Sequence, residues 1–195
     1  ALTLAGGWSL SQAKPEPCGQ AGEWRQPGSV PAPVAGAALL DNRLDVRIAR
    51  ADLDDPEVQA LIAFHQQAMQ AGSPPGLSFA LDLSGLADPA VTVWAVRVDD
   101  RVAAIGALKL LGGGQAELKS MRTHPDFLRR GIAAQLLEAI IDHARSQAIT
   151  RLSLETGSGP AFDPALALYR KRGFVNGAAF GDYVLTDFNQ CLHLS

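Results

Sequence analysis

The chain has 195 residues, of which 47% are hydrophobic and 19% charged, and its formal net charge is −3 at pH 7. This composition is typical of a soluble globular protein with a substantial core. The sequence has no basic run and no apolar run of membrane-spanning length, so we expect no nucleic acid and no membrane among its partners. Its two cysteines, Cys18 and Cys191, and its four scattered histidines match no disulfide framework and no metal-ligand spacing. We therefore expect no bound metal and a cytoplasmic location.

Residues 1–42 form a Pro/Gly-rich N-terminal extension that precedes a domain expected over residues 43–195. Residues 1–40 contain five prolines and six glycines, a composition that opposes formation of a packed core. Trp8 and Trp24 leave open that the extension docks on the domain or on a partner, but we favour a loosely structured segment. No basic segment is followed here by an uninterrupted apolar run, so we expect no signal peptide.

The domain begins with a predicted strand, a helix and an ambiguous segment. Residues 44–49 alternate in polarity as a half-buried strand does. Asp55 and Pro56 are typical of a helix start, and the apolar periodicity continues until Ser73 begins a Ser-Pro-Pro-Gly break. Residues 79–86 fit either a short helix or a loop over one end of the sheet.

Three strands follow as an antiparallel meander, predicted over residues 91–98, 101–111 and 115–123. A tight turn at Asp99–Asp100 joins the first two, and Gly112–Gly114 join the last two. The three glycines could also suggest a phosphate-binding loop. No Gly-Lys-Ser/Thr follows them, so we interpret them as a hairpin turn.

The second half of the domain contains a crossover. The period of apolar residues predicts a helix from Ile132 to about Ser146, and a strand follows over residues 150–156. A strand, a helix and a strand joined in this way place the two strands parallel. Asp163 and Pro164 are then predicted as the N-cap and first residue of a helix that Gly173 ends. Further strands are expected over residues 174–180 and 191–194.

These elements predict an α+β fold. Its sheet is mixed and mostly antiparallel with one central parallel pair, and helices flank both faces. The turn before the second long helix contains Arg129, Arg130 and Gly131. Such a turn aims free backbone N–H groups and the positive end of a helix dipole at one point, which favours a pyrophosphate site. The alternative is an ordinary strand–turn–helix connection with its arginines in solvent.

Two segments together resemble the GNAT N-acetyltransferase superfamily. Gly131 and Ala133 match its motif Q/R-x-x-G-x-G/A. A second motif, A-x-x-L-Y-x-x-x-G-F, is matched in the right order by Ala165, Leu168, Tyr169, Gly173 and Phe174. Leu128 departs from the Q/R position, and Phe162 stands where many members carry an asparagine. The resemblance covers roughly residues 44 to 195. The segments S-P-P near residue 73, A-L-D-L near 80, L-E-T-G-S near 154 and F-G-D-Y near 180 resemble a bacterial subgroup of small GNAT proteins with poorly defined substrates.

The resemblance implies an acetyl-CoA-dependent N-acetyltransferase that acts on the amine of a small molecule, such as an amino acid or related metabolite. In this fold the central strand diverges from its parallel neighbour, and acetyl-CoA lies in the gap. The strand would bind the pantetheine, and the glycine turn would bind the pyrophosphate. The residues implied in cofactor binding are Met121, Arg122, Thr123, Arg129, Arg130, Gly131, Ile132, Ala133 and Ala134.

The same resemblance implies two catalytic residues. Tyr169 would protonate the leaving thiolate, and its alternative is a tyrosine packed on the core. Glu117 would act as general base, directly or through water. The alternation of the strand places Glu117 on the same face as Met121. The alternative for Glu117 is a surface carboxylate paired with Lys119 or with a residue of a neighbouring strand.

The acceptor side of the cleft is predicted from fewer signals. Lys119 could hold a carboxylate of the substrate or could be solvated, and His65 and Phe79 are further candidates for the lining. A non-catalytic acyl-CoA sensor and a protein-interaction module stay open as alternatives to an enzyme. A homodimer also stays open, and the sequence does not identify the acceptor.

Overall fold

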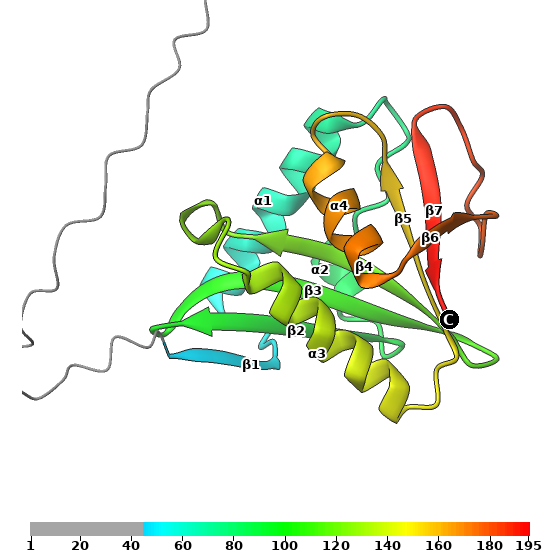
Figure 1. The fold of residues 1–195 in the computed structure, drawn as a ribbon. Coiled ribbons are helices and arrows are strands. Elements are labelled where there is room, and N and C mark those ends of the chain that lie inside the picture. The colour runs from blue at the N-terminus through cyan, green and yellow to red at the C-terminus, as the bar shows by residue number, and fades with distance from the viewer. Residues whose placement is uncertain (1–44) are drawn as a thin grey trace, which may run out of the picture. The chain divides into compact units, whose positions relative to one another are not determined.

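The computed structural model of the protein describes residues 45–195 (Figure 1). The predicted extension over residues 1–42, with Trp8 and Trp24, lies outside the described residues. In chain order the elements are β1 (Val46–Arg50), α1 (Pro56–Gly72), α2 (Leu83–Leu86), β2 (Val91–Val98), β3 (Arg101–Gly112), β4 (Gln115–Thr123), the 3-10 helix η1 (Pro125–Phe127), α3 (Ile132–Ser146), β5 (Arg151–Gly157), α4 (Asp163–Arg172), β6 (Val175–Gly177) and β7 (Asn189–Leu194).

The strands form one sheet of seven in the order β1-β2-β3-β4-β5-β7-β6. Strands β4 and β5 are parallel, and every other neighbouring pair is antiparallel. The parallel pairing is short, because it joins only residues 115–117 to residues 151–153. Beyond Glu117 the two strands separate. The predicted mixed sheet and its central parallel pair are confirmed, and the separation of β4 from β5 positions the site.

Helices cover both faces of the sheet, as predicted (Figure 1). Alternate residues of β2 pack in opposite directions: Trp94 and Val96 lie in the cluster that contains α3 and α4, whereas Val93 and Ala95 lie in the cluster that contains α1 and α2. Both faces are therefore apolar, which explains why β2 and β3 are almost continuously hydrophobic in sequence. No helix within residues 45–195 is long and apolar enough to cross a membrane.

The ends of the helices agree with the sequence in all but one place. The Asp55 side chain caps α1 by accepting from the Glu57 N–H at 2.8 Å, and Gly173 ends α4 in a left-handed conformation. The predicted N-cap of α4 is wrong, because Phe162 occupies that position and Asp163 is the first helical residue. The buried Phe162 ring packs edge-on against Phe188, with ring centroids 5.6 Å apart. This packing fixes the start of the helix where no side chain caps it.

Two segments are shorter than the sequence suggests. The ambiguous segment at residues 79–86 contains only a four-residue helix, which Asp82 caps. The strand expected over residues 174–180 is limited to three residues on the sheet edge. At its end the Gly177 backbone lies against His193, where an added Cβ would come within 2.4 Å of the ring. The chain leaves the sheet after this contact.

A β-bulge in β4 determines where the side chains of the site point. Lys119 pairs with Ala107, and Arg122 pairs with Ile105, so two residues of β4 lie opposite the single residue Gly106. Ser120 adopts a left-handed conformation with φ +53°. The extra residue reverses the alternation of the strand beyond this point.

Glu117, Lys119 and Arg122 consequently face α1, whereas Met121 packs in the cluster on the α3 face. The prediction that Glu117 and Met121 share a face is therefore wrong. Gly106 allows this arrangement, because a Cβ there would lie 2.5 Å from the Met121 sulfur.

Candidate active site

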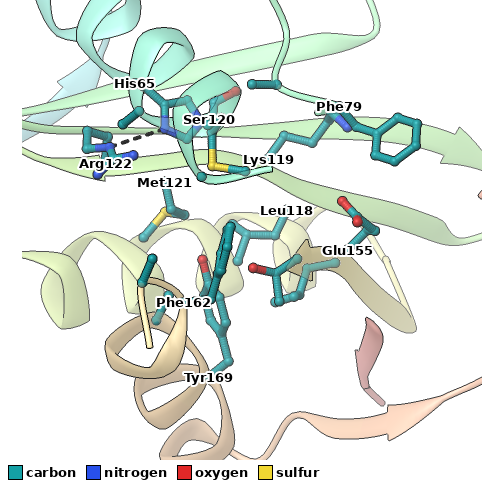
Figure 2. Close-up of a pocket in the computed structure, with 18 of the residues that line it drawn as sticks. His65, Phe79, Leu118, Lys119, Ser120, Met121, Arg122, Glu155, Phe162 and Tyr169 are labelled. Carbon is teal, nitrogen blue, oxygen red and sulfur yellow. Dashed lines mark hydrogen bonds between the residues drawn. The ribbon is translucent and has the colours of Figure 1, made fainter. Parts of the chain in front are cut away.

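A cavity of about 220 Å³ opens where β4 and β5 separate (Figure 2). We call it cavity A. Its lining comes from α1, from the loop that contains Phe79, from residues 117–122 of β4, from residues 154–156 of β5 and from α4. Polar and ionisable side chains concentrate there, namely His65, Glu117, Lys119, Arg122, Glu155 and Tyr169.

A second cavity, cavity B, has a volume of about 300 Å³ and lies between the end of β4, the start of α3 and α4. Its lining is mostly apolar and includes Thr123, Leu128, Ala133 and Leu168. The two cavities share the lining residues Met121, Arg122, Ala161, Ala165 and Tyr169. The two cavities are therefore adjacent, with Tyr169 in the lining of both.

The turn before α3 borders cavity B through Leu128 and Ala133. Arg129 and Gly131 both have left-handed backbones, with φ +59° and +77°, and α3 begins without a side-chain cap. Within residues 45–195, the N–H groups of residues 129–134 have no backbone acceptor. These uncapped amides therefore lie at the positive end of the helix dipole, an arrangement that suits an anion.

The side chains of the turn differ in what they can add to this geometry. The Arg130 guanidinium stacks on the Phe127 ring, 5.3 Å from its centroid, and Arg129 is exposed. The Ile132 side chain is buried in the core, so only its backbone N–H faces the turn. Ala134 is exposed on the first turn of α3. Backbone amides, rather than the two arginines, are the fixed part of this site.

Glu117 lies in a buried network of three polar side chains. Its Oε1 atom accepts from Lys119 Nζ at 2.8 Å and from the Tyr183 hydroxyl at 2.5 Å, and the hydroxyl accepts from Lys119 Nζ at 2.6 Å. The side chains of Glu117 and Lys119 are only 6% and 9% exposed. Glu117 is thus paired with Lys119, as one alternative proposed, but neither residue is at the surface and Lys119 is not solvated.

Tyr183 was not among the residues predicted for the site. It lies in the loop between β6 and β7, and its ring meets Phe79, a lining residue of cavity A, edge-on at 5.1 Å. Burial and the adjacent Glu117 carboxylate raise the pKa of Tyr183, so its hydroxyl stays protonated and donates a hydrogen bond to Glu117. Glu155 was also missed. It lines cavity A from β5, and burial raises the pKa of its carboxyl.

His65 and Arg122 lie together at the end of cavity A away from Lys119 and Phe79 (Figure 2). Arg122 Nε donates to His65 Nδ1 at 3.2 Å, so the other ring nitrogen of His65 carries the proton. Burial, and then the charge of Arg122, lower the pKa of His65 to about 4. Burial also lowers the pKa of Arg122.

The buried His65 should make the protein less stable in acid. Its unfolded pKa is 6.5 and its folded pKa is about 4. As the pH falls from 6.5 to 4, His65 therefore binds a proton in the unfolded chain but stays neutral in the folded chain. Stability contributed by the neutral ring is complete above pH 6.5 and is lost through this window, by about 3 kcal/mol. Urea unfolding between pH 7 and 4 should show this loss in the wild type.

The matched variant is His65→Gln, because glutamine can also accept from Arg122 but does not titrate. Other groups titrate in both proteins, so the difference between the two pH profiles isolates His65. Parallel profiles for the two proteins would contradict the assignment of a neutral, buried His65.

Tyr169 occupies the junction of the two cavities. Its side chain is 7% exposed and packs against Phe174, with ring centroids 5.8 Å apart. Burial raises the pKa of its hydroxyl, so the phenol stays protonated at neutral pH. The structure thus places Tyr169 with Met121 and Arg122 at the junction, Glu117, Lys119, His65 and Phe79 around cavity A, and Thr123 and Ala133 around cavity B. Within residues 45–195 no three His, Cys, Asp or Glu side chains are grouped to hold a metal ion.

Comparison with known proteins gives a consistent result. The acetyltransferase (GNAT) family model matches residues 55–174. The chain is 46% identical over 144 residues to the uncharacterized N-acetyltransferase YedL of Escherichia coli (strain K12), a match covering 74% of this chain and 91% of that protein. It is 42% identical over 132 residues to the uncharacterized N-acetyltransferase YsnE of Bacillus subtilis (strain 168), covering 68% of this chain and 87% of the relative.

Among solved structures, an acetyltransferase of Bacillus subtilis in complex with CoA resembles the chain with a TM-score of 0.58. The match covers 76% of this chain and 97% of that one, at 16% sequence identity. At this identity the likeness concerns the fold alone.

Proposed function

The chain belongs to the acetyltransferase (GNAT) family and is an acyltransferase, and on this premise we propose that it transfers an acetyl group from acetyl-CoA to the amine of a small molecule. The observation that carries the proposal is that cavities A and B share Tyr169 in their linings. Cavity B borders the turn whose amides lack backbone acceptors within residues 45–195, and cavity A is lined by ionisable side chains. Cavity A, at about 220 Å³, is smaller than the roughly 300–1,000 Å³ typical of drug-sized ligands, which favours a small acceptor.

The residues of the chain fit CoA on the side of cavity B. The N–H groups of residues 129–134 suit the pyrophosphate, because they lack backbone acceptors within the described chain. The mostly apolar lining between β4 and α4 suits the pantetheine, which the backbone of Met121, Arg122 and Thr123 would bind along one wall. When bound, acetyl-CoA supplies the acetyl group as an activated thioester.

The side chains of cavity A then bind the acceptor and remove a proton from its ammonium group. His65, Lys119 and Phe79 line the space for the acceptor. Glu117 Oε2 has no hydrogen-bond partner within residues 45–195 and can take a proton from the acceptor ammonium, directly or through water. The Tyr169 hydroxyl, protonated and at the junction, donates toward the sulfur where negative charge develops.

The turn offers a direct test of this function. At a concentration a hundredfold above its Kd, acetyl-CoA should stabilise the folded protein by about 2.7 kcal/mol through mass action. The melting temperature should therefore rise with acetyl-CoA and should not rise with NAD. Acetyl-CoA mixed with the protein and a panel of small amines should release free thiol.

Gly131→Asn should weaken acetyl-CoA binding at least tenfold, since asparagine tolerates the left-handed backbone but brings its side chain to the amides.

The control is Gly113→Asn in the β3–β4 hairpin. Gly113 also has a positive φ, +57°, and open space where a Cβ would lie. The Gly113→Asn variant should bind acetyl-CoA with the wild-type affinity. Equal affinity in folded Gly131→Asn and in the control would remove the pyrophosphate assignment. If the protein binds acetyl-CoA but no amine of the panel causes release of free thiol, the proposed acetyl transfer is wrong.

A further inference from the structure

We propose that the acceptor carries a carboxylate next to its reacting amine, as an α-amino acid does, and that Arg122 binds this carboxylate. The inference rests on the proposed acetyl transfer and deepens it. The sequence suggested Lys119 for this role and assigned Arg122 to the cofactor. The contacts in the structure favour the Arg122 side chain over Lys119 for this role.

Two cations line cavity A, and within residues 45–195 only one of them, Lys119, has a carboxylate partner. Lys119 is neutralised by its contact with Glu117. Within residues 45–195, no carboxylate lies within ion-pairing distance of the Arg122 guanidinium, whose single hydrogen bond goes from Nε to the neutral ring of His65. Arg122 is half-buried, and burial lowers its pKa because the charged form loses hydration without gaining a counter-charge. A cation in this condition gains most from an anionic ligand.

The orientation of Arg122 is set by its neighbours. His65 holds Nε, and the ring of Phe64 lies under the guanidinium at 5.4 Å. The bulge at Ser120 directs the side chain toward α1, which is the opposite face from α3. The phosphate turn leads into α3, so the CoA phosphates have their own site on the other side of the sheet. Within the described part of the chain, the two remaining guanidinium nitrogens have no hydrogen-bond partner and can bind both oxygens of a carboxylate.

The place of Arg122 limits how far the amine can be from the carboxylate. Arg122 lines the junction of the two cavities together with Tyr169. The reacting amine must reach the same junction, so the two groups of the acceptor lie within a few bonds of each other. The acceptor's side chain would then point toward the Lys119, Phe79 and Glu155 end of the cavity (Figure 2). An α-amino acid satisfies this arrangement, whereas a polyamine offers nothing to Arg122.

The test compares matched acceptors in the thiol-release assay with acetyl-CoA. The panel contains the twenty L-amino acids, their carboxamides, and decarboxylated amines including cadaverine, phenethylamine and the polyamines. At least one amino acid should be turned over with kcat/KM about 10²-fold above its own carboxamide, because an unpaired Arg122 is left when the carboxylate is missing. Turnover of carboxamides or amines at rates equal to or above every amino acid overturns the inference but leaves the proposed acetyl transfer intact.

A variant tests the residue itself. Arg122→Gln should reduce kcat/KM for the preferred amino acid about 10²-fold, mainly through KM, and should bring the amino acid and its carboxamide to similar rates. The Kd for acetyl-CoA should not change. The control is Arg151→Gln, an exposed arginine at the start of β5 that lies outside both cavities. It should retain the wild-type rates and preference.

Two results with Arg122→Gln would overturn the assignment. One is loss of acetyl-CoA affinity, which would place Arg122 on the cofactor. The other is an equal loss of rate for the amino acid and its carboxamide, which is what a merely structural arginine would give.

Discussion

Replacing Tyr169 with phenylalanine should lower kcat by roughly 10²–10⁴-fold, the range typical of lost acid catalysis. The ring stays in place, so its packing against Phe174 should be kept. The melting temperature and its increase with acetyl-CoA should therefore barely change. The loss belongs to the hydroxyl alone, which lies where cavities A and B meet.

The environment of Tyr169 also specifies how the hydroxyl acts. A free tyrosine has a pKa near 10 and a free thiol has one near 8.5, so full proton transfer from phenol to thiolate is uphill. Burial raises the pKa of Tyr169 and makes that transfer more unfavourable. The hydroxyl should therefore act mainly by donating a hydrogen bond to the sulfur as its charge develops, and the released thiolate then takes its proton from water. Full activity of Tyr169→Phe, with CoA release faster than turnover, would leave Tyr169 as a packing residue.

Most of the fold could be predicted because its signals are local. The periodicity of α3, the Asp55-Pro56 start of α1 and the glycine hairpin each depend on neighbouring residues, and the structure has them where expected. The parallel pairing of β4 with β5 followed from the crossover. The start of α4 was displaced by one residue because packing of Phe162, a tertiary contact, took precedence over the capping preference of Asp163.

The candidate site was harder to predict, because the faces of β4 depend on one residue. Ser120 adopts a left-handed backbone that the sequence gives no reason to expect, since neither glycine nor asparagine stands there. A regular alternation placed Arg122 opposite to Lys119, whereas the bulge brings both to the α1 face. Tyr183 reaches Glu117 across 66 residues of sequence, and only the fold of its loop makes that contact.

Replacing Glu117 with glutamine should reduce both the stability and the activity of the protein. The change removes the charge that compensates Lys119, whose side chain is 9% exposed. Breaking a buried ion pair by neutralising one partner costs about 3–5 kcal/mol, because the other charge is left unpaired. If Glu117 is the base, deprotonation of the acceptor then depends on bulk solvent, and the rate should rise with pH only where free hydroxide or buffer base can substitute.

A loss of activity in Glu117→Gln alone would not separate catalysis from stability, so the double variant Glu117→Gln/Lys119→Met is the deciding protein. Methionine has a length similar to that of lysine and leaves no unpaired charge, so urea unfolding should show most of the lost stability restored. Lys119→Met alone is the control, because it keeps the carboxylate and its hydrogen bond from Tyr183. If Glu117 is the general base, the double variant should be stable but remain as slow as Glu117→Gln, with kcat lower than wild type by roughly 10²-fold or more. Recovery of kcat together with stability would make the Glu117–Lys119–Tyr183 network a structural element. Proton removal would then be assigned to another group, and Glu155, a carboxylate that lines cavity A from β5, would be the next candidate.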